Sequence, residues 1–277
     1  MRIALIAALA ASSLAYAADI EDYTQVTASM NHERSDGWDS SGLGVTAHGA
    51  KSLGNGLGLL GGARADWEHP CSSLFDDCHQ ARSYEYEGEL GLVWRRAGLG
   101  QLSAGFGRQR IEARSSGGSS HRHSVNFYQL GAEYYLNGMG VLGAQVQRSR
   151  SDEPLRIGQQ SWTTSSLFAE YWRDNLTVGG RLTRYRPNHG TDSELALKWY
   201  GDERLALGAT GENLDKDQRR IGFGVRYRLP FANNALTVGS ELQFARQDYR
   251  ALQLNLRYDF GPGAKLSLKE RDRSLRY

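Results

Sequence analysis

The chain has 277 residues, with 33 Lys and Arg against 31 Asp and Glu, so its formal net charge is only +2. This balance excludes strong electrostatic attraction to nucleic acid, and a count of two cysteines excludes a disulfide-rich scaffold. The mean hydropathy of −0.55 fits a soluble protein. It also fits a β-barrel whose lipid-facing and water-facing residues alternate and average out.

The first 17 residues have the pattern of a secretory signal peptide. Arg2 precedes the apolar run "IALIAALAASSLA", and Ala15 and Ala17 supply the small residues of a cleavage site after Ala17. The apolar run is too short for an ordinary spanning helix, and no later run reaches about 18 apolar residues. We expect an exported chain without a transmembrane helix, in which loss of Arg2 leaves 32 of the 33 basic residues against 31 acidic ones.

Apolar and polar residues alternate through almost all of the mature chain. In "LQLNLRYDF" (252–260), leucines and aromatic residues occupy every second position and polar residues occupy the others. A period of two predicts a β-strand with one apolar and one polar face. In chain order, the predicted strands cover residues 22–34, 41–52, 56–68, 82–94, 100–113, 124–136, 140–151, 161–173, 175–186, 192–200, 203–212, 218–229, 235–246 and 250–260.

The connections between these strands alternate in length. Every second join, starting after the second strand, is a tight turn: "GNG", "RAGLG", "NGMG", "DN", "GDE" and "FANN". The other joins tend to be longer and more polar, as in "EHPCSSLFDDCHQA". Short periplasmic turns and longer outer loops are typical of outer-membrane barrels. We therefore predict an all-β fold: a transmembrane antiparallel up-and-down β-barrel over residues 18–260, with about 14 strands and a range of roughly 12 to 16.

The two faces of the strands have different compositions. The polar face carries many charged residues and so cannot form a dry core, whereas the apolar face ends in aromatic residues suited to the membrane interface. These aromatic residues are Trp67, Trp94, Trp199, Tyr227 and Tyr258. The alternative is a soluble β-sandwich or a cell-surface β-domain. The pattern favours a barrel in the outer membrane of a Gram-negative bacterium.

The expected lumen of the barrel is lined by charges that segregate along the chain. A barrel of about 14 strands is too wide for side chains to fill, so its polar face surrounds water. Acidic and basic walls facing each other would create a transverse field that orients polar solutes. Alternatively, these charges pair with one another and stiffen the barrel. The predicted pore-lining residues are Glu85, Glu87, Glu89, Glu133, Glu170, Arg181, Lys198, Arg226, Arg228 and Glu241.

Arginines follow the apolar positions on the outward faces of three strands, at the end expected to face outside the cell. They are Arg108, Arg110, Arg148, Arg150, Arg184 and Arg186. Guanidinium groups bind phosphates in a bidentate manner, so Arg148, Arg150, Arg184 and Arg186 are predicted to contact lipopolysaccharide. A generic solvated rim of arginines is the alternative.

Three further patterns suggest a disulfide, a metal site or a catalytic pair. Cys71 and Cys78 are expected to form a small disulfide loop in an oxidising compartment, and a metal site with His69 and His79 is the less favoured reading. His123 and Ser124 in "HRHSVNF" suggest a lipid hydrolase. Because adjacent residues on a strand point to opposite faces, we expect no enzyme, no metal and no cofactor.

The last strand ends in the aromatic Phe260, after apolar residues at every second position. This resembles the C-terminal assembly signal of outer-membrane barrels, although here 17 residues follow it. The basic tail, residues 261–277, is expected to be a periplasmic or lumenal extension, or an extra strand. It is a candidate contact for a periplasmic partner.

By strand number, size and lack of an obvious plug, residues 22–260 resemble OmpG-type monomeric porins. That resemblance implies a monomeric channel for passive diffusion of small hydrophilic solutes, such as sugars. No functional residue is carried over, because none of that family's motifs is matched. The chain is also similar to the barrel domain of surface lipoprotein assembly modifiers, which implies an export or assembly barrel for a lipoprotein or polysaccharide. A structural surface barrel is a third alternative.

Overall fold

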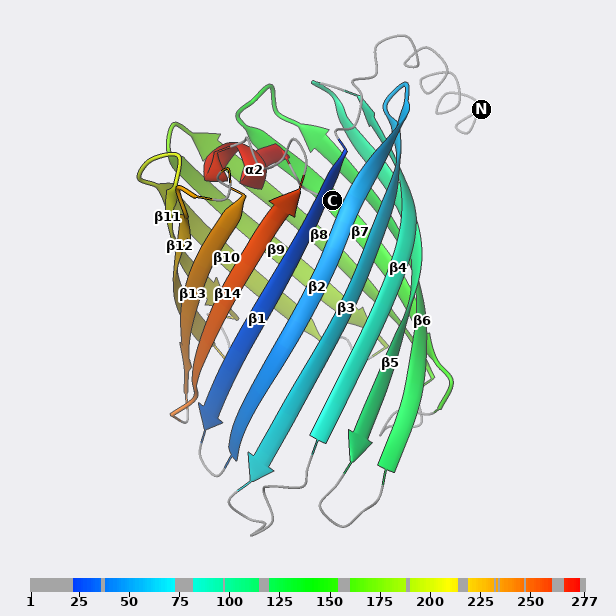
Figure 1. Ribbon diagram of the computed structural model, residues 1–277. Helices are drawn as coiled ribbons and strands as arrows, with labels where there is room; N and C mark the ends of the chain where they lie inside the picture. Colours follow the sequence, from blue (N-terminus) through cyan, green and yellow to red (C-terminus); the bar gives the residue numbers. More distant parts are fainter. Residues whose placement is uncertain are drawn as a thin grey trace, which may run out of the picture.

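The architecture is a closed cylinder of antiparallel strands, seen in a computed structural model of the chain (Figure 1). The structure describes residues 22–35, 38–72, 82–96, 98–114, 120–153, 160–187, 190–213, 219–231, 233, 235–246, 248–260 and 267–274. Each strand pairs with its neighbours in chain order, and β1 pairs with β14 to close the barrel. The prediction of an antiparallel up-and-down transmembrane barrel is confirmed.

The described residues contain 14 strands, as the alternation predicted. Their bounds are β1 Tyr23–Ser35, β2 Trp38–Gly54, β3 Leu57–Ser72, β4 Arg82–Arg96, β5 Gly100–Arg114, β6 Ser120–Tyr135, β7 Gly140–Ser151, β8 Ser161–Arg173, β9 Leu176–Arg186, β10 Thr191–Tyr200, β11 Leu205–Glu212, β12 Arg220–Arg228, β13 Leu236–Ala245 and β14 Arg250–Phe260.

Strands β2, β3 and β6 extend further than the alternation indicated. β2 begins at Trp38 and pairs there with Ser72, the last residue of β3, in a segment expected to be loop. β6 begins at Ser120, opposite Arg114 of β5. Backbone hydrogen bonds hold such extensions whatever side chains they carry, so an apolar periodicity does not mark where they end.

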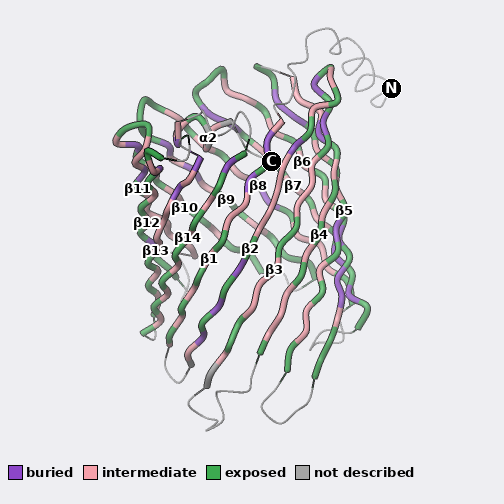
Figure 2. Tube along the Cα trace, in the orientation of Figure 1, coloured by how far each residue is buried: buried purple, intermediate pink, exposed green. Residues whose placement is uncertain are grey.

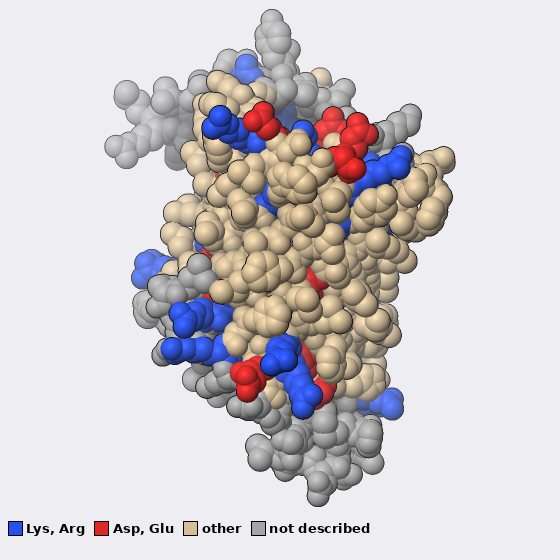
Figure 3. Space-filling model, turned by 90° about the vertical axis from the view of Figure 1, so that its left-hand side faces the viewer, with Lys and Arg blue, Asp and Glu red and all other residues tan. Residues whose placement is uncertain are grey.

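The apolar face of every strand points away from the lumen. Exposed and partly buried residues alternate along the strands (Figure 2), and large apolar side chains remain exposed on the outer face, with Leu130 and Leu167 each 64% exposed. Seen from the side, an uncharged band separates charged groups near the two ends (Figure 3). An exposed apolar surface of this extent fits contact with lipid hydrocarbon.

The two ends of the barrel differ. At one end, here called the turn end, tight turns connect β2 to β3, β4 to β5, β6 to β7 and β8 to β9 (Figure 1). The first residue of β1 and the last residue of β14 lie at this end too. Asn137 and Gly138 adopt positive φ values of 44° and 77° in the β6–β7 turn, the conformation that a two-residue hairpin turn requires. The opposite end is called the loop end.

A short helix, α2 (Leu268–Ser274), follows the last strand and lies inside the barrel at the turn end (Figure 1). Its start is a capping box: the backbone N–H of Glu270 donates to Ser267 Oγ (3.1 Å), and the backbone N–H of Ser267 donates to Glu270 Oε2 (2.9 Å). The sequence pattern gives no sign of this helix, because its seven residues, about two turns, are too few to show a helical period.

No helix among the described residues has the length and apolar character needed to cross a membrane.

Candidate functional site: the lumen and its C-terminal helix

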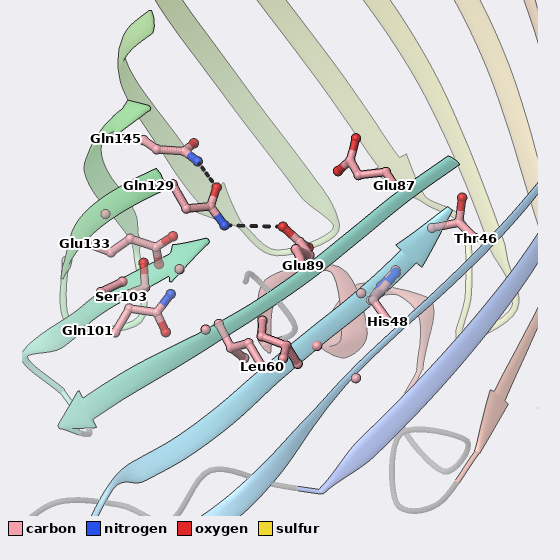
Figure 4. Close-up of a pocket in the computed structure, with 18 of the residues that line it drawn as sticks. Thr46, His48, Leu60, Glu87, Glu89, Gln101, Ser103, Gln129, Glu133 and Gln145 are labelled. Atoms are coloured by element: carbon pink, nitrogen blue, oxygen red, sulfur yellow. Dashed lines mark hydrogen bonds between the residues drawn. The ribbon is translucent and has the colours of Figure 1, made fainter. Parts of the chain in front are cut away.

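The lumen holds a cavity of about 540 Å³, lined by residues of strands β1 to β9. The lining combines charged groups such as Glu87 and Arg181 with amides such as Gln129 and Gln145. Figure 4 shows Glu87, Gln129 and Gln145 among the side chains that line the cavity. Polar, water-accessible walls of this kind allow hydrated solutes to enter.

Five of the six predicted acidic residues lie on the part of this wall formed by β4, β6 and β8. Glu87, Glu89, Glu133 and Glu170 line the cavity, and Glu85 lies further along β4, where it accepts a hydrogen bond from Gln109 (2.8 Å). The structure thus brings these five acidic residues together, whereas the sixth, Glu241, lies on β13.

Glutamine side chains donate hydrogen bonds to some carboxylates of this acidic wall. Gln145 Nε2 donates to Gln129 Oε1 (3.1 Å), and Gln129 Nε2 donates to Glu89 Oε2 (3.3 Å), forming a chain across three strands (Figure 4). Glu85 and Glu89 therefore obtain hydrogen bonds from neutral neighbours on the same wall. Pairing with basic residues across the lumen is not needed to satisfy these two carboxylates.

The predicted basic residues lie on the wall formed by β9, β10 and β12. Lys198 and Arg226 line a smaller cavity of about 120 Å³ together with Glu241 and Asn255. Arg181 lies at the edge of the larger cavity, with its guanidinium carbon 5.3 Å from the centre of the Phe168 ring. Arg228 is the last residue of β12 and is only 3% exposed. Its side chain is therefore buried in the wall and does not line the open lumen.

Several lumenal residues were not singled out from sequence. Arg64 and Asp66 form an ion pair on β3, beside the acidic wall, and Arg257 pairs with Asp259 on β14 at 3.5 Å. His48 also lines the larger cavity. All five sit on the polar face of their strands, so the alternation alone would have included them.

Glycines on the inner face make room for bulky neighbours. A Cβ at Gly143 would collide with the ring of Phe168, and a Cβ at Gly107 would collide with the ring of Phe127. The abundance of glycine in these strands is explained here by close approach of inward aromatic rings.

The helix α2 is anchored to the basic wall by a buried carboxylate. Asp272 forms a two-point ion pair with Arg226, in which Nη1 donates to Oδ1 (3.0 Å) and Nη2 donates to Oδ2. The Tyr200 hydroxyl also donates to Oδ2 (2.9 Å). Leu268 is fully buried against Tyr200 and Ala206. The tail thus combines an apolar contact with a charge-assisted one.

A second set of contacts ties α2 to the β8–β9 turn. Arg273 Nη2 donates to the backbone carbonyls of Asp174 (3.1 Å) and Leu176 (3.0 Å), and its guanidinium lies 5.7 Å from the ring centre of Trp172. Lys269 Nζ donates to Asn175 Oδ1 (3.1 Å). Of the locations expected for the tail, the structure places this part in the lumen.

The charge state of Asp272 follows from these neighbours. Burial acts to raise its pKa, but the attraction and hydrogen bonds of Arg226, with the attraction of Lys198, outweigh burial and lower the pKa to about 2. Because the pKa of Asp272 is lower in the docked helix, the ion pair stabilises docking fully at any pH above the usual pKa of an aspartate. Its contribution is lost only as the pH falls toward about 2.

The predicted arginine collar lies on the outer face near the loop end. Register places Arg150 two strands from Arg108, with only Asn126 between them, and Arg148 two strands from Arg186, with only Thr163 between them. Each arginine of these pairs is exposed. A short polar residue between two arginines leaves an open gap about 10 Å wide, since strands lie about 4.8 Å apart.

The remaining groups singled out from sequence lie on β3 and β6 or outside the described residues. His123 and Ser124 are consecutive on β6, and the backbone N–H of Ser124 donates to Asp152 Oδ1 (2.7 Å). Cys71 lies in β3 opposite Asp39, whereas Cys78 and His79 lie outside the described residues, as does the predicted signal peptide. Within the described part of the chain, no group of three or more His, Cys, Asp or Glu side chains is placed to hold a metal ion.

The closed cylinder, the exposed apolar band and the polar lumen define the chain as a β-barrel of the bacterial outer-membrane class. No protein-family model matches the sequence, and no curated protein matches it either.

Solved structures match the fold. A variant of the monoaromatic hydrocarbon channel TodX lacking S2 has a TM-score of 0.52 at 9% identity, covering 86% of this chain and 88% of that one. A variant of the same channel lacking S2 and S3 has a TM-score of 0.51 at 10% identity, with 86% and 89% covered. Acinetobacter baumannii Omp33 has a TM-score of 0.49 at 13% identity, with 86% and 99% covered. At these identities the likeness concerns the fold alone, and the two TodX variants share the β-barrel fold with this chain.

Proposed function

We propose that the protein is an outer-membrane channel for passive diffusion of small hydrophilic solutes, acting as a monomer. The observation that supports this most is the polar cavity of about 540 Å³ inside a single closed chain. Its walls present carboxylates, amides and guanidinium groups, which replace part of a solute's hydration shell. Sugars fit such walls because their hydroxyl groups both donate and accept hydrogen bonds.

The turn end is proposed to face the periplasm, since short turns mark that side in outer-membrane barrels. The export alternative relies on a tail that is free to bind a partner. Contacts of Asp272, Arg273 and Leu268 with the inner wall argue against such a free arm.

Single-channel recording in planar bilayers tests the proposal. We expect full-length protein to give steady ionic currents, and Glu87→Gln combined with Glu89→Gln to lower the cation-to-anion permeability ratio about two-fold or more, because the acidic wall then loses two charges. Glu112→Gln is the matched control, because Glu112 pairs with Arg110 (2.8 Å) and Arg122 (3.0 Å) outside the cavity lining. Absence of current from correctly folded protein would refute the channel.

We also propose that the arginine collar binds lipopolysaccharide through its phosphates. The exposed side chains of Arg148, Arg150, Arg184 and Arg186 lie on the outer wall near the loop end. Their guanidinium groups lie beside gaps lined by short polar residues such as Asn126 and Thr163. Bidentate pairing with phosphate suits this geometry.

The collar is tested by lipopolysaccharide binding to detergent-solubilised protein. Arg148→Gln combined with Arg150→Gln is expected to weaken binding by roughly ten-fold or more, because each lost charge-assisted bond contributes about 1.5–3 kcal/mol. Arg250→Gln, an exposed arginine at the loop end of β14, is the control and is expected to bind normally. Equal affinity of all three proteins would show that the collar is only a solvated rim.

A further inference from the structure

The contacts around Asp272 have the composition of a carboxylate receptor. Arg226 offers both terminal nitrogens of its guanidinium group, and the Tyr200 hydroxyl adds a third donor to the same carboxylate. The two Arg226 donors match the spacing of two carboxylate oxygens, which gives geometric selectivity as well as energy. Lys198, on the same strand as Tyr200, adds attraction.

All three receptor side chains belong to the barrel wall, not to the tail. Tyr200 and Lys198 lie on β10, and Arg226 lies on β12. Only Asp272 comes from α2. The receptor is therefore built by the part of the chain that forms the pore, and the tail supplies the group that fills it.

A solute in the lumen has access to the same place. Lys198 and Arg226 line the cavity of about 120 Å³, and the amide of Asn255 and the hydroxyl of Thr210 line it as well. The side chain of Arg226 is 30% exposed, whereas that of Asp272 is 10% exposed. Part of the Arg226 side chain thus remains exposed while its guanidinium group holds the carboxylate.

We propose that Arg226, Tyr200 and Lys198 form a binding site for carboxylate-bearing solutes, and that Asp272 occupies it as an internal competitor. A hydroxylated organic acid fits this site, because its carboxylate pairs with Arg226 and its hydroxyl groups suit Asn255 and Thr210. Binding of such a solute and docking of α2 exclude each other, so the solute displaces the helix. This inference rests on the proposed channel and names a solute class for it.

Equilibrium binding of gluconate to full-length protein in detergent tests the proposal, with glucose as the uncharged comparison. The wild-type chain is expected to bind gluconate weakly. Asp272→Asn is expected to bind it at least about ten-fold more tightly, because the internal carboxylate no longer competes and a charge-assisted bond is freed. Glucose is expected to bind both proteins equally weakly.

A second substitution added to Asp272→Asn distinguishes the contribution of the receptor side chains from that of Asp272. Adding Arg226→Gln to Asp272→Asn is expected to abolish the gain, and adding Lys198→Gln is expected to reduce it, so the outcome does not depend on one variant folding. Adding Arg250→Gln, at the exposed loop end of β14, is expected to leave the gain intact. Far-ultraviolet circular dichroism checks that each variant keeps its β-structure.

Two results would overturn the inference. One is equal gluconate affinity for wild type and Asp272→Asn, and the other is a gain that survives Arg226→Gln. If these variants still conduct ions, either result leaves the proposed channel function standing. Absence of current in the wild type would instead refute the channel function and would say nothing about gluconate affinity.

Discussion

Deleting residues 261–277 is expected to raise single-channel conductance by about two-fold or more, because narrow segments dominate the resistance of a water-filled pore. Helix α2 lies inside the barrel at the turn end, where its side chains reach β8, β10 and β12. The barrel itself closes through pairing of β1 with β14, which ends at Phe260. Removal of the tail therefore widens the pore without opening the cylinder, and planar-bilayer recording measures the change.

A substitution that keeps the chain length separates undocking from truncation. Leu268 is fully buried between Tyr200 and Ala206, so Leu268→Glu places a charge in an apolar contact and releases the helix. We expect the conductance of this variant to approach that of the deletion. Lys269→Gln removes a single exposed contact with Asn175 and is expected to behave as wild type. Unchanged conductance after deletion would show that α2 does not narrow the path.

Leu130→Arg is expected to destabilise the barrel by about 2–4 kcal/mol, the cost of a basic residue facing lipid at mid-membrane depth. Leu130 is 64% exposed and lies on the outer face of β6, which it shares with Tyr128 and Tyr134. Its neighbours in register are Ala104 and Val146. Reversible unfolding in phospholipid vesicles measures the free energy.

The matched control places the same charge one residue away. Gln129 precedes Leu130 but points into the lumen, where it bonds Glu89. Gln129→Arg is expected to change the free energy of unfolding by less than about 1 kcal/mol, because water and the acidic wall receive the charge. A similar cost for both variants would contradict the assignment of the outer face to lipid.

The alternation of apolar and polar residues was sufficient to predict the strands and their faces. "LQLNLRYDF" forms β14, with Leu254 exposed outside and Asn255 lining the lumen. Glu87 and Arg181 could be assigned to the inner face because a period of two leaves no other choice once lipid takes the apolar side. Strand ends were harder to locate, as β3 shows by continuing to Ser72.

The docked tail could not be predicted in the same way. Its position depends on Asp272 meeting Arg226 and on Leu268 meeting Ala206, contacts between segments far apart in the chain. The tail contains one local indication of a helix start, the pair Ser267 and Glu270, which has the spacing of a capping box. The glutamine chain through Gln129 is equally hard to predict, because its hydrogen bonds join side chains on β4, β6 and β7.

Closure of the cylinder by its first and last strands has a consequence for biogenesis. Thr24 must find Phe260, so the seam joins the two extremes of the barrel sequence and cannot form before β14 has been made. Such distant pairing costs the most loop entropy and forms slowly. The receptor for Asp272 is assembled from β10 and β12 on the concave surface. Because α2 follows β14 in the chain, its docking on this receptor also cannot precede synthesis of the last strand.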